Sequence, residues 1–222
     1  MRLAIVTGAA ATAGAARVLA LVPHLATEHE LEIFAEREGE LPGSRRVRPV
    51  TELTPRELDH LVFVVEDDPA CGFMLPLVRE IGGTVALAHW SLARAARAAY
   101  AELGRPGLRG TVRAWREGGL ADLLAWRRGD LGDLSFNRSA VRFADSFIVP
   151  SEDLRRRVLV ERNAPTPIGV VEPQADAASQ ARAWTEILGR FPSPRSSRKT
   201  LFRLRVQQAI ARRHASPGGK AV

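Results

Sequence analysis

Several side chains that can bind ligands or transfer protons stand at the ends of apolar runs. His89 comes near the end of the apolar run at 83–90, and Asp67 and Asp68 follow the run at 60–66. An imidazole can act as a general acid or base, and carboxylates can accept hydrogen bonds from hydroxyl groups. The same residue types also serve structure, because a histidine at a strand end is often hydrogen-bonded and an Asp-Asp-Pro sequence often caps a helix. Both interpretations stay open at this point.

Three more candidates stand where helices are expected to begin. Gly14 opens the helical pattern at 14–27, where a helix N-terminus would offer backbone N–H groups to an anion. Arg138 and Ser151 open two later helical patterns. A guanidinium suits a phosphate or a carboxylate, whereas Ser151, followed by two acidic residues, is also an ordinary helix start.

The elements that must position these residues alternate along the chain. Apolar, β-branched runs predict strands, and helical periodicity fills most of the intervals between them. The predicted strands cover residues 2–7, 30–35, 60–66, 83–90, 145–151 and 166–173. This alternation is typical of an α/β fold, a doubly wound, Rossmann-like parallel sheet with helices on both faces. In such a sheet ligands bind beyond the carboxyl ends of the strands, where the candidates above are expected to gather.

The domain is expected to cover residues 1–192, with a helical insert at about 105–132 and a returning helix at about 175–190 that closes it. Residues 39–49, rich in Gly, Pro and Arg, are predicted to form a loop. Thr54 and Ser91 are expected to cap the helices that follow them. Three tryptophans in helical patterns are expected to be packing residues: Trp115, Trp126 and Trp184.

Composition limits the class of protein. The 222 residues, 45% of them hydrophobic, are enough for one sizeable core and an appendage. Cys71 is the single cysteine, so no internal disulfide can form, and we expect a small buried thiol in a reducing cytoplasm. The sequence shows no secretory signal and no apolar run long enough to span a bilayer. The histidines show no metal-binding spacing, so no metal site is predicted.

Residues 193–222 differ in composition from the rest of the chain. After a Ser/Pro-rich break, Phe202, Val206 and Ile210 recur four apart among arginines. This pattern predicts a basic amphipathic helix at 198–213, suited to docking on a partner protein or on the anionic inner face of a membrane. The net charge of +7 comes almost wholly from arginine, which is also typical of GC-rich genomes, so a nucleic-acid partner is not expected.

The segment AIVTGAAATAG resembles the phosphate-binding turn of short-chain dehydrogenases, T-G-x-x-x-G-x-G. Thr7, Gly8 and Gly14 match, but Thr12 stands where a glycine lets the backbone approach a pyrophosphate. That family also needs a Tyr with a Lys four residues later, and the single tyrosine, Tyr100, has a glycine at that distance. An active dehydrogenase of this family is not expected. An NAD(P)-binding, oxidoreductase-like domain stays as a lesser alternative.

An ordered set of motifs carries a second resemblance. The chain contains DDPACGFM, GTVALAHWSL, FNRSAVRFADSFIVPS and IGVVEPQAD in this order, with a helical insert after the second. The order resembles the acceptor-side half of GT-B-fold glycosyltransferases of the family 4 type, over about residues 1–173. In that family the corresponding motifs are a GN turn with an FHxFM helix, GxVVLHDxxL, an NR helix start before IVHS, and VIPHG.

The resemblance implies a glycosyltransferase-like protein with a Rossmann-like acceptor domain. In the family a second domain holds the nucleotide-sugar donor, and transfer needs no obligatory metal. By resemblance His89 is the catalytic candidate. The candidates for binding the acceptor or a phosphate are Gly14, Asp67, Asp68, Arg138 and Ser151. No cofactor is expected on this chain itself.

The chain departs from the family in two ways. After IGVVEP it runs at once into what resembles the family's returning helix, so the donor-binding domain is missing from this place. In addition, His89 and Trp90 stand for the family's HD, and Asp67 and Asp68 for its GN. One hypothesis is the acceptor-binding half of a split glycosyltransferase, served by a separate donor-domain protein and taking a carbohydrate or lipid-linked acceptor. The other is a non-catalytic relative that acts as a binding or scaffold protein.

Overall fold

The computed structural model of the chain describes residues 1–8, 12–41, 45–105, 107–130, 132, 134–173 and 176–191. The strands within these ranges follow the six predicted runs closely, and two further strands lie between the second and third of these runs. The described strands are β1 (Arg2–Val6), β2 (Glu30–Ala35), β3 (Gly39–Leu41), β4 (Arg45–Pro49), β5 (His60–Val65), β6 (Thr84–Leu87), β7 (Ser146–Val149) and β8 (Ile168–Val170).

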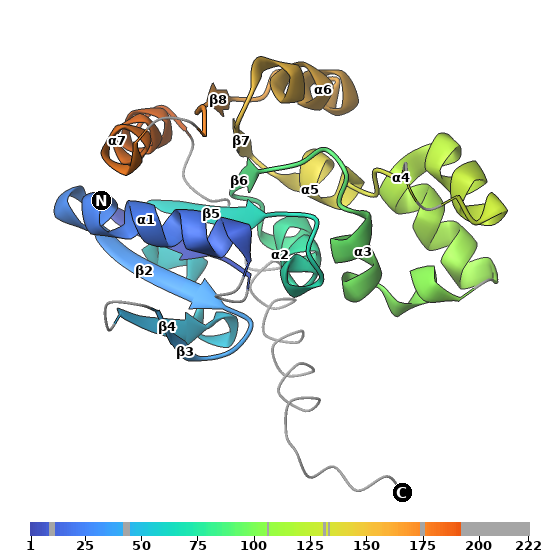
Figure 1. The fold of residues 1–222 in the computed structure, drawn as a ribbon, viewed down its shortest axis with the longest axis horizontal. Coiled ribbons are helices and arrows are strands. Elements are labelled where there is room, and N and C mark those ends of the chain that lie inside the picture. The colour runs from blue at the N-terminus through green and yellow to red at the C-terminus, as the bar shows by residue number, and fades with distance from the viewer. Residues whose placement is uncertain are drawn as a thin grey trace, which may run out of the picture.

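The described strands form one sheet in the order β3-β4-β2-β1-β5-β6-β7-β8 (Figure 1). Neighbours pair in parallel, except that β3 is antiparallel to β4. The chain starts at the centre with β1, moves outward through β2 and β4, then returns to β5 and moves outward on the other side. This is the doubly wound arrangement, so the predicted Rossmann-like α/β fold is confirmed.

Helices cover both faces of the sheet because every second strand residue points to the same face. Leu3 and Ile5 of β1 pack with α1 (Ala13–Glu28) and α7 (Ala177–Leu188), whereas Ala4 and Val6 belong to the core on the other face. The helices that contribute most to that second core are α2 (Met74–Ile81), α3 (Ala93–Ala99), α5 (Arg138–Phe143) and α6 (Glu152–Arg162), and the insert described below adds to it. Short 3-10 turns lie between these elements: η1 (Val50–Glu52), η2 (Pro55–Glu57), η3 (Pro69–Cys71) and η4 (Ala101–Gly104).

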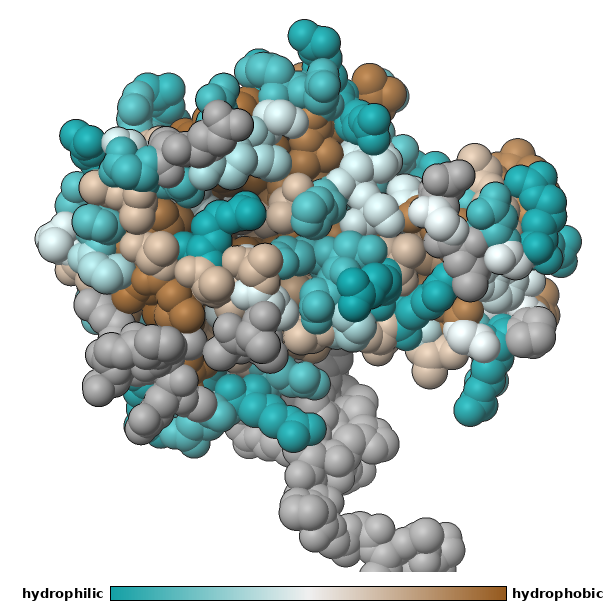
Figure 2. Space-filling model, in the orientation of Figure 1, coloured by the Kyte–Doolittle hydropathy of each residue, from teal (hydrophilic) through white to brown (hydrophobic). Residues whose placement is uncertain are grey.

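The insert between β6 and β7 forms α4 (Leu108–Arg128), two helical segments that meet at a break at Gly119, where φ is +80°, and it projects at one end of the molecule (Figure 1). Ala114 packs into the core, but Leu108, Leu120 and Leu124 are exposed. Figure 2 shows hydrophobic atoms among hydrophilic ones at this end. No helix within the described ranges is long and apolar enough to cross a membrane.

The closing helix α7 returns to the first helix of the chain. It packs against α1, where His29 Nε2 lies 2.9 Å from Thr185 Oγ1. It also covers β8, because a Cβ on Gly169 would lie only 2.5 Å from Ile187 Cδ1. Asp176 caps the start of α7 by accepting a 2.9 Å hydrogen bond from the Ser179 backbone N–H.

The prediction of a loop at 39–49 was wrong, because β3 and β4 lie there. In β4, Val47 is buried while Arg48 lies at the sheet margin, with Nη1 2.7 Å from Glu32 and Nε 3.0 Å from Glu52. Arginine with Gly and Pro is typical of loops. Here ion pairs with the neighbouring strand β2 and with η1 hold β4, a strand with few apolar residues that lies between β3 and β2.

Two predicted caps and one predicted packing residue also differ. Ser91 does not cap α3; its Oγ donates a 2.6 Å hydrogen bond to the Leu134 carbonyl. Thr54 precedes η2 without a side-chain capping bond. Trp184 is buried and the Trp126 indole donates to the Leu103 carbonyl at 3.0 Å, but Trp115 is 54% exposed. The predicted basic helix at 198–213, like all of 193–222, lies outside the described residues.

Candidate functional site

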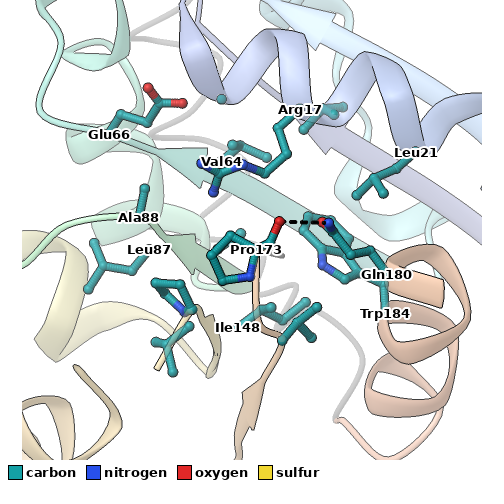
Figure 3. A pocket seen from close by; sticks show the side chains of 16 residues that line it. Arg17, Leu21, Val64, Glu66, Leu87, Ala88, Ile148, Pro173, Gln180 and Trp184 are labelled. Carbon is teal, nitrogen blue, oxygen red and sulfur yellow. Dashed lines mark hydrogen bonds between the residues drawn. The ribbon is translucent and has the colours of Figure 1, made fainter. Parts of the chain in front are cut away.

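The carboxyl ends of β1 and β5 lie side by side at the centre of the sheet. The chain leaves β1 toward α1 on one face and β5 toward α2 on the other, which is where doubly wound proteins bind ligands. On the α1 face a pocket of about 50 Å³ opens here, between α1 and α7 (Figure 3). We call it the carboxyl-edge pocket. Its main polar side chains are Arg17, Glu66 and Gln180.

Glu66, the first residue after β5, is the most unusual group of this pocket. It is only 7% exposed, and its Oε1 has no hydrogen-bond partner among the residues that the structure describes. Its carboxylate fills the space above Gly14, where an added Cβ would lie 1.5 Å from Oε1. Gly14 therefore leaves room for a buried carboxyl group at the N-terminus of α1.

Burial raises the pKa of Glu66 above its ordinary value, because the charged form loses its hydration. The positive charge of Arg17, and to a smaller extent His89, opposes this rise. Arg17 extends from α1 over the pocket (Figure 3), and His89 is exposed after β6. A carboxyl group with a raised pKa beside an imidazole and a guanidinium can donate or accept a proton and can bind hydroxyl groups.

The opposite wall of the pocket comes from α7. Trp184 and Gln180 are both buried, and the Gln180 Nε2 donates a 3.3 Å hydrogen bond to the Pro173 carbonyl (Figure 3). The returning helix thus completes the pocket as well as the core. A pocket of about 50 Å³ has room for one hydroxyl-sized group and its nearest atoms, whereas small-molecule sites usually measure about 300 Å³ or more.

The two predicted aspartates lie directly after Glu66, but both are hydrogen-bonded to backbone. Asp67 Oδ1 accepts from the N–H groups of Arg94 at 2.6 Å and Ala95 at 3.3 Å, so it caps α3 in place of Ser91. Asp68 Oδ1 accepts from the Ala70 N–H at 2.8 Å and caps η3. Both aspartates hold the turns around the edge of the sheet.

The structure separates the remaining predicted residues. Ser151 caps α6 by accepting a 3.3 Å hydrogen bond from the Leu154 N–H, and it follows Pro150, which lines the carboxyl-edge pocket. Arg138 is elsewhere, on the other face of the sheet, where its Nε lies 3.0 Å from Glu161 Oε1. Gly14 and Glu66 touch, His89 and Ser151 lie near the same edge, and Arg138 does not join them.

Cysteine and metal chemistry find no support at this site. Cys71 is buried below Gly8, and burial raises the pKa of its thiol to about 11, so it stays protonated near neutral pH. Within the described ranges, no group of three or more His, Cys, Asp or Glu side chains is placed to hold a metal ion.

Sequence patterns did not single out Glu66, Arg17 and Gln180. Glu66 carries a recognisable signal, an acidic residue directly after a fully apolar strand. That signal indicates a residue at the centre of the sheet edge only when β5 is known to lie beside β1. Arg17 and Gln180 face each other through the packing of α7 on α1, and no local pattern encodes that packing.

Comparison with known proteins adds no relative: no family model, no curated protein and no solved structure matches this chain.

Proposed function

We propose that this chain is the acceptor-binding half of a split glycosyltransferase, whose nucleotide-sugar-binding half is a separate protein. The observation that carries the proposal is the carboxyl-edge pocket, where the buried Oε1 of Glu66 has no hydrogen-bond partner among the described residues and where Arg17 and His89 influence the carboxyl group electrostatically. The order of sequence motifs supports it, as does the direct step from β8 to the returning helix α7.

In this proposal one hydroxyl group of a carbohydrate or lipid-linked acceptor enters the pocket and donates a hydrogen bond to Glu66, while a second, reacting hydroxyl group of the acceptor faces His89. The oxygen of the reacting hydroxyl group forms a bond to the anomeric carbon of the donor sugar as the bond from that carbon to the nucleoside diphosphate breaks. His89 takes up the hydroxyl proton, and the leaving diphosphate carries its charge away on the partner protein. His89 is exposed, two residues beyond β6, and an imidazole can act as a general base.

The size of the pocket is the reason for proposing a partner. About 50 Å³ accepts part of an acceptor but not a nucleotide-sugar. The donor would then be held by another chain facing the carboxyl edge of the sheet. The basic segment at 198–213, which lies outside the described residues, would dock that partner or an anionic membrane that bears the acceptor.

A non-catalytic binding or scaffold protein is the second candidate. It is favoured by the engagement of Asp67 and Asp68 in helix capping, which leaves few free polar groups at this edge. Dinucleotide binding of the dehydrogenase type is disfavoured, because the carboxylate of Glu66 lies at the α1 N-terminus, where a pyrophosphate would bind.

The test is affinity capture of the full chain from its native cell, followed by a sugar-transfer assay of the captured complex with labelled nucleotide-sugars. The expected result is a captured protein that binds nucleotide-sugar, and transfer that His89→Ala lowers by about tenfold or more. Glu172→Gln, an exposed acidic residue near the edge, is the matched control and should retain activity. Capture without transfer, with His89→Ala equal to the parent in every assay, would favour the non-catalytic candidate.

A further inference from the structure

A second pocket, of about 280 Å³, lies on the sheet face opposite the carboxyl-edge pocket, between α2, α4 and α5. Four arginines line it: Arg79, Arg116, Arg138 and Arg142. We call it the arginine pocket. Four guanidinium groups around one cavity repel each other unless anions balance them, so their partners decide what the pocket can bind.

Two of the four arginines are balanced within the protein and two are not. Arg138 Nε and Arg142 Nη2 each lie 3.0 Å from the same Glu161 oxygen. Among the residues that the structure describes, neither Arg79 nor Arg116 forms an ion pair with a carboxylate. The pocket therefore presents two uncompensated guanidinium groups, which match the charge of one phosphate monoester dianion.

The pocket also has an apolar, aromatic side. Trp115 lines it and is 54% exposed, although a tryptophan in a helix usually packs inward. Phe143 lies beside it, with the Arg79 guanidinium 5.4 Å from the ring centre. Exposed aromatic faces beside guanidinium groups suit a ligand that carries both a ring and an anion.

The floor of the pocket is built from buried polar groups. Glu117, 1% exposed, accepts hydrogen bonds from Arg113 Nη1 at 3.4 Å and from the Ser139 backbone N–H at 3.3 Å. Arg113 lies 4.0 Å above the Tyr100 ring, which fixes its position. The only carboxylate lining the described pocket is thus paired with Arg113, which also lies 3.7 Å from Glu102. Glu117 joins α4 to α5, so the arginines of these two helices project from a fixed wall.

We propose that the arginine pocket binds a small organic phosphate monoester. Its phosphate lies between Arg79 and Arg116, and its ring packs on Trp115. A volume of about 280 Å³ is close to the lower end of small-ligand sites and suits one ring with one phosphate. The proposal does not rest on glycosyl transfer, because the two pockets share no lining residue.

The test is calorimetric titration of the full chain with phenyl phosphate, with phenol as the uncharged counterpart. We expect phenyl phosphate to bind with a millimolar or lower Kd, and this Kd should rise as NaCl is added. Phenol should bind more weakly than phenyl phosphate, by about tenfold or more. The variant Arg79→Gln/Arg116→Gln should lose about tenfold or more of the affinity. The side chains of Arg79 and Arg116 are both exposed, so the double variant should still fold. Arg116→Gln alone should also lower the affinity for phenyl phosphate, but by less.

The matched control is Arg156→Gln/Arg157→Gln, which removes the same net charge from the exposed face of α6. It should bind phenyl phosphate within about twofold of the parent. Trp115→Phe should remove the fluorescence change that accompanies binding. Three results would overturn the proposal. The control variant could lose as much affinity as Arg79→Gln/Arg116→Gln, or phenyl phosphate could fail to bind at about 20 mM. The third is that a nucleic acid or an anionic vesicle binds through these arginines while phenyl phosphate does not.

Discussion

Glu66 and Asp122 are two acidic residues buried to almost the same degree, 7% and 8% exposed, at two ends of the fold. Asp122, in α4, places one oxygen 2.6–2.9 Å from three donors: the Ser135 N–H, the Ser135 hydroxyl and the Phe136 N–H. Glu66 has an oxygen with no partner among the described groups. Burial alone therefore does not tell what a carboxylate does.

The difference separates a carboxylate that maintains the fold from one that is available to a ligand. Asp122 holds a turn in which Phe136 has a φ of +41°, a left-handed conformation that costs energy for a bulky residue. The same turn is tied to the end of β6 by the Asn137 side-chain N–H, 2.7 Å from the Trp90 carbonyl. Glu66 fixes no such turn, and its burial has an energetic cost that a bound hydroxyl would reduce.

The largest effect is expected for Asp122→Ala. Three donors lose their charged acceptor and the turn at Phe136 loses its support, so the free energy of unfolding should fall by about 3 kcal/mol. Urea denaturation measures the loss. The exposed Asp130→Ala serves as control and should change stability by less than about 0.5 kcal/mol. A loss below about 1 kcal/mol for Asp122→Ala would remove the contrast with Glu66.

Gly14→Ala should come next, with a loss of about 2 kcal/mol, because the new methyl group would collide with the Glu66 carboxylate and crowd Val64. Adding Glu66→Ala should recover much of this loss, since it empties the space. The double-mutant cycle by chemical denaturation checks the coupling. Alanine is otherwise favoured over glycine in a helix, so a stabilised Gly14→Ala variant would show that Glu66 does not occupy this place.

Asp67→Ala tests the neighbour of Glu66, which we regard as structural. Loss of the cap on α3 should lower the free energy of unfolding by about 1 kcal/mol, measured by thermal or urea denaturation. Glu172→Ala is the exposed control. If Asp67→Ala left stability unchanged and abolished ligand binding, Asp67 would belong to the binding site. Our assignment of a structural role to Asp67 and a ligand-binding role to Glu66 would then be incorrect.

The smallest effect, and the one with opposite sign, is expected for Glu66→Gln. Because the folded-state pKa of Glu66 is raised, its stabilising contribution is complete below the unfolded pKa and is lost as pH rises through the folded pKa. At pH 7 the variant should therefore be as stable as the parent, or more stable, within about 1 kcal/mol. The difference in the free energy of unfolding between Glu66→Gln and the parent should disappear as the pH falls toward about 4. Unfolding curves recorded at several pH values measure it.

Most of the fold was predictable because its signals are local and repeated. The apolar run at 60–66 and the helical periodicity at 14–27 predict β5 (His60–Val65) and α1 (Ala13–Glu28) to within one residue at each end. The strand β4 was missed because Arg48 is held by Glu32 and Glu52, partners that a local pattern cannot supply. The α3 cap was misassigned to Ser91 because the actual cap, Asp67, lies far away in sequence.

The site was less predictable because it depends on strand order. The sequence pointed to the same edge of the sheet through Gly14, Asp67 and His89. It did not reveal that Gly14 makes room for Glu66, or that α7 closes the pocket with Gln180. The sequence also did not distinguish the positions of two residues that both begin helices. Ser151 lies near this edge of the sheet, whereas Arg138 lines the arginine pocket.

The most direct test of the central claim, that a buried oxygen of Glu66 is left without a partner and is open to a ligand, is an NMR titration of the side-chain carboxyl carbon. The resonance is assigned with Glu66→Gln. We predict a pKa above the ordinary glutamate value that rises further in Arg17→Gln and, by a smaller step, in His89→Ala, because each variant removes a positive charge that opposes the rise. A pKa at or below the ordinary value, unmoved by either variant, would show a carboxylate already satisfied like that of Asp122 and would contradict the account.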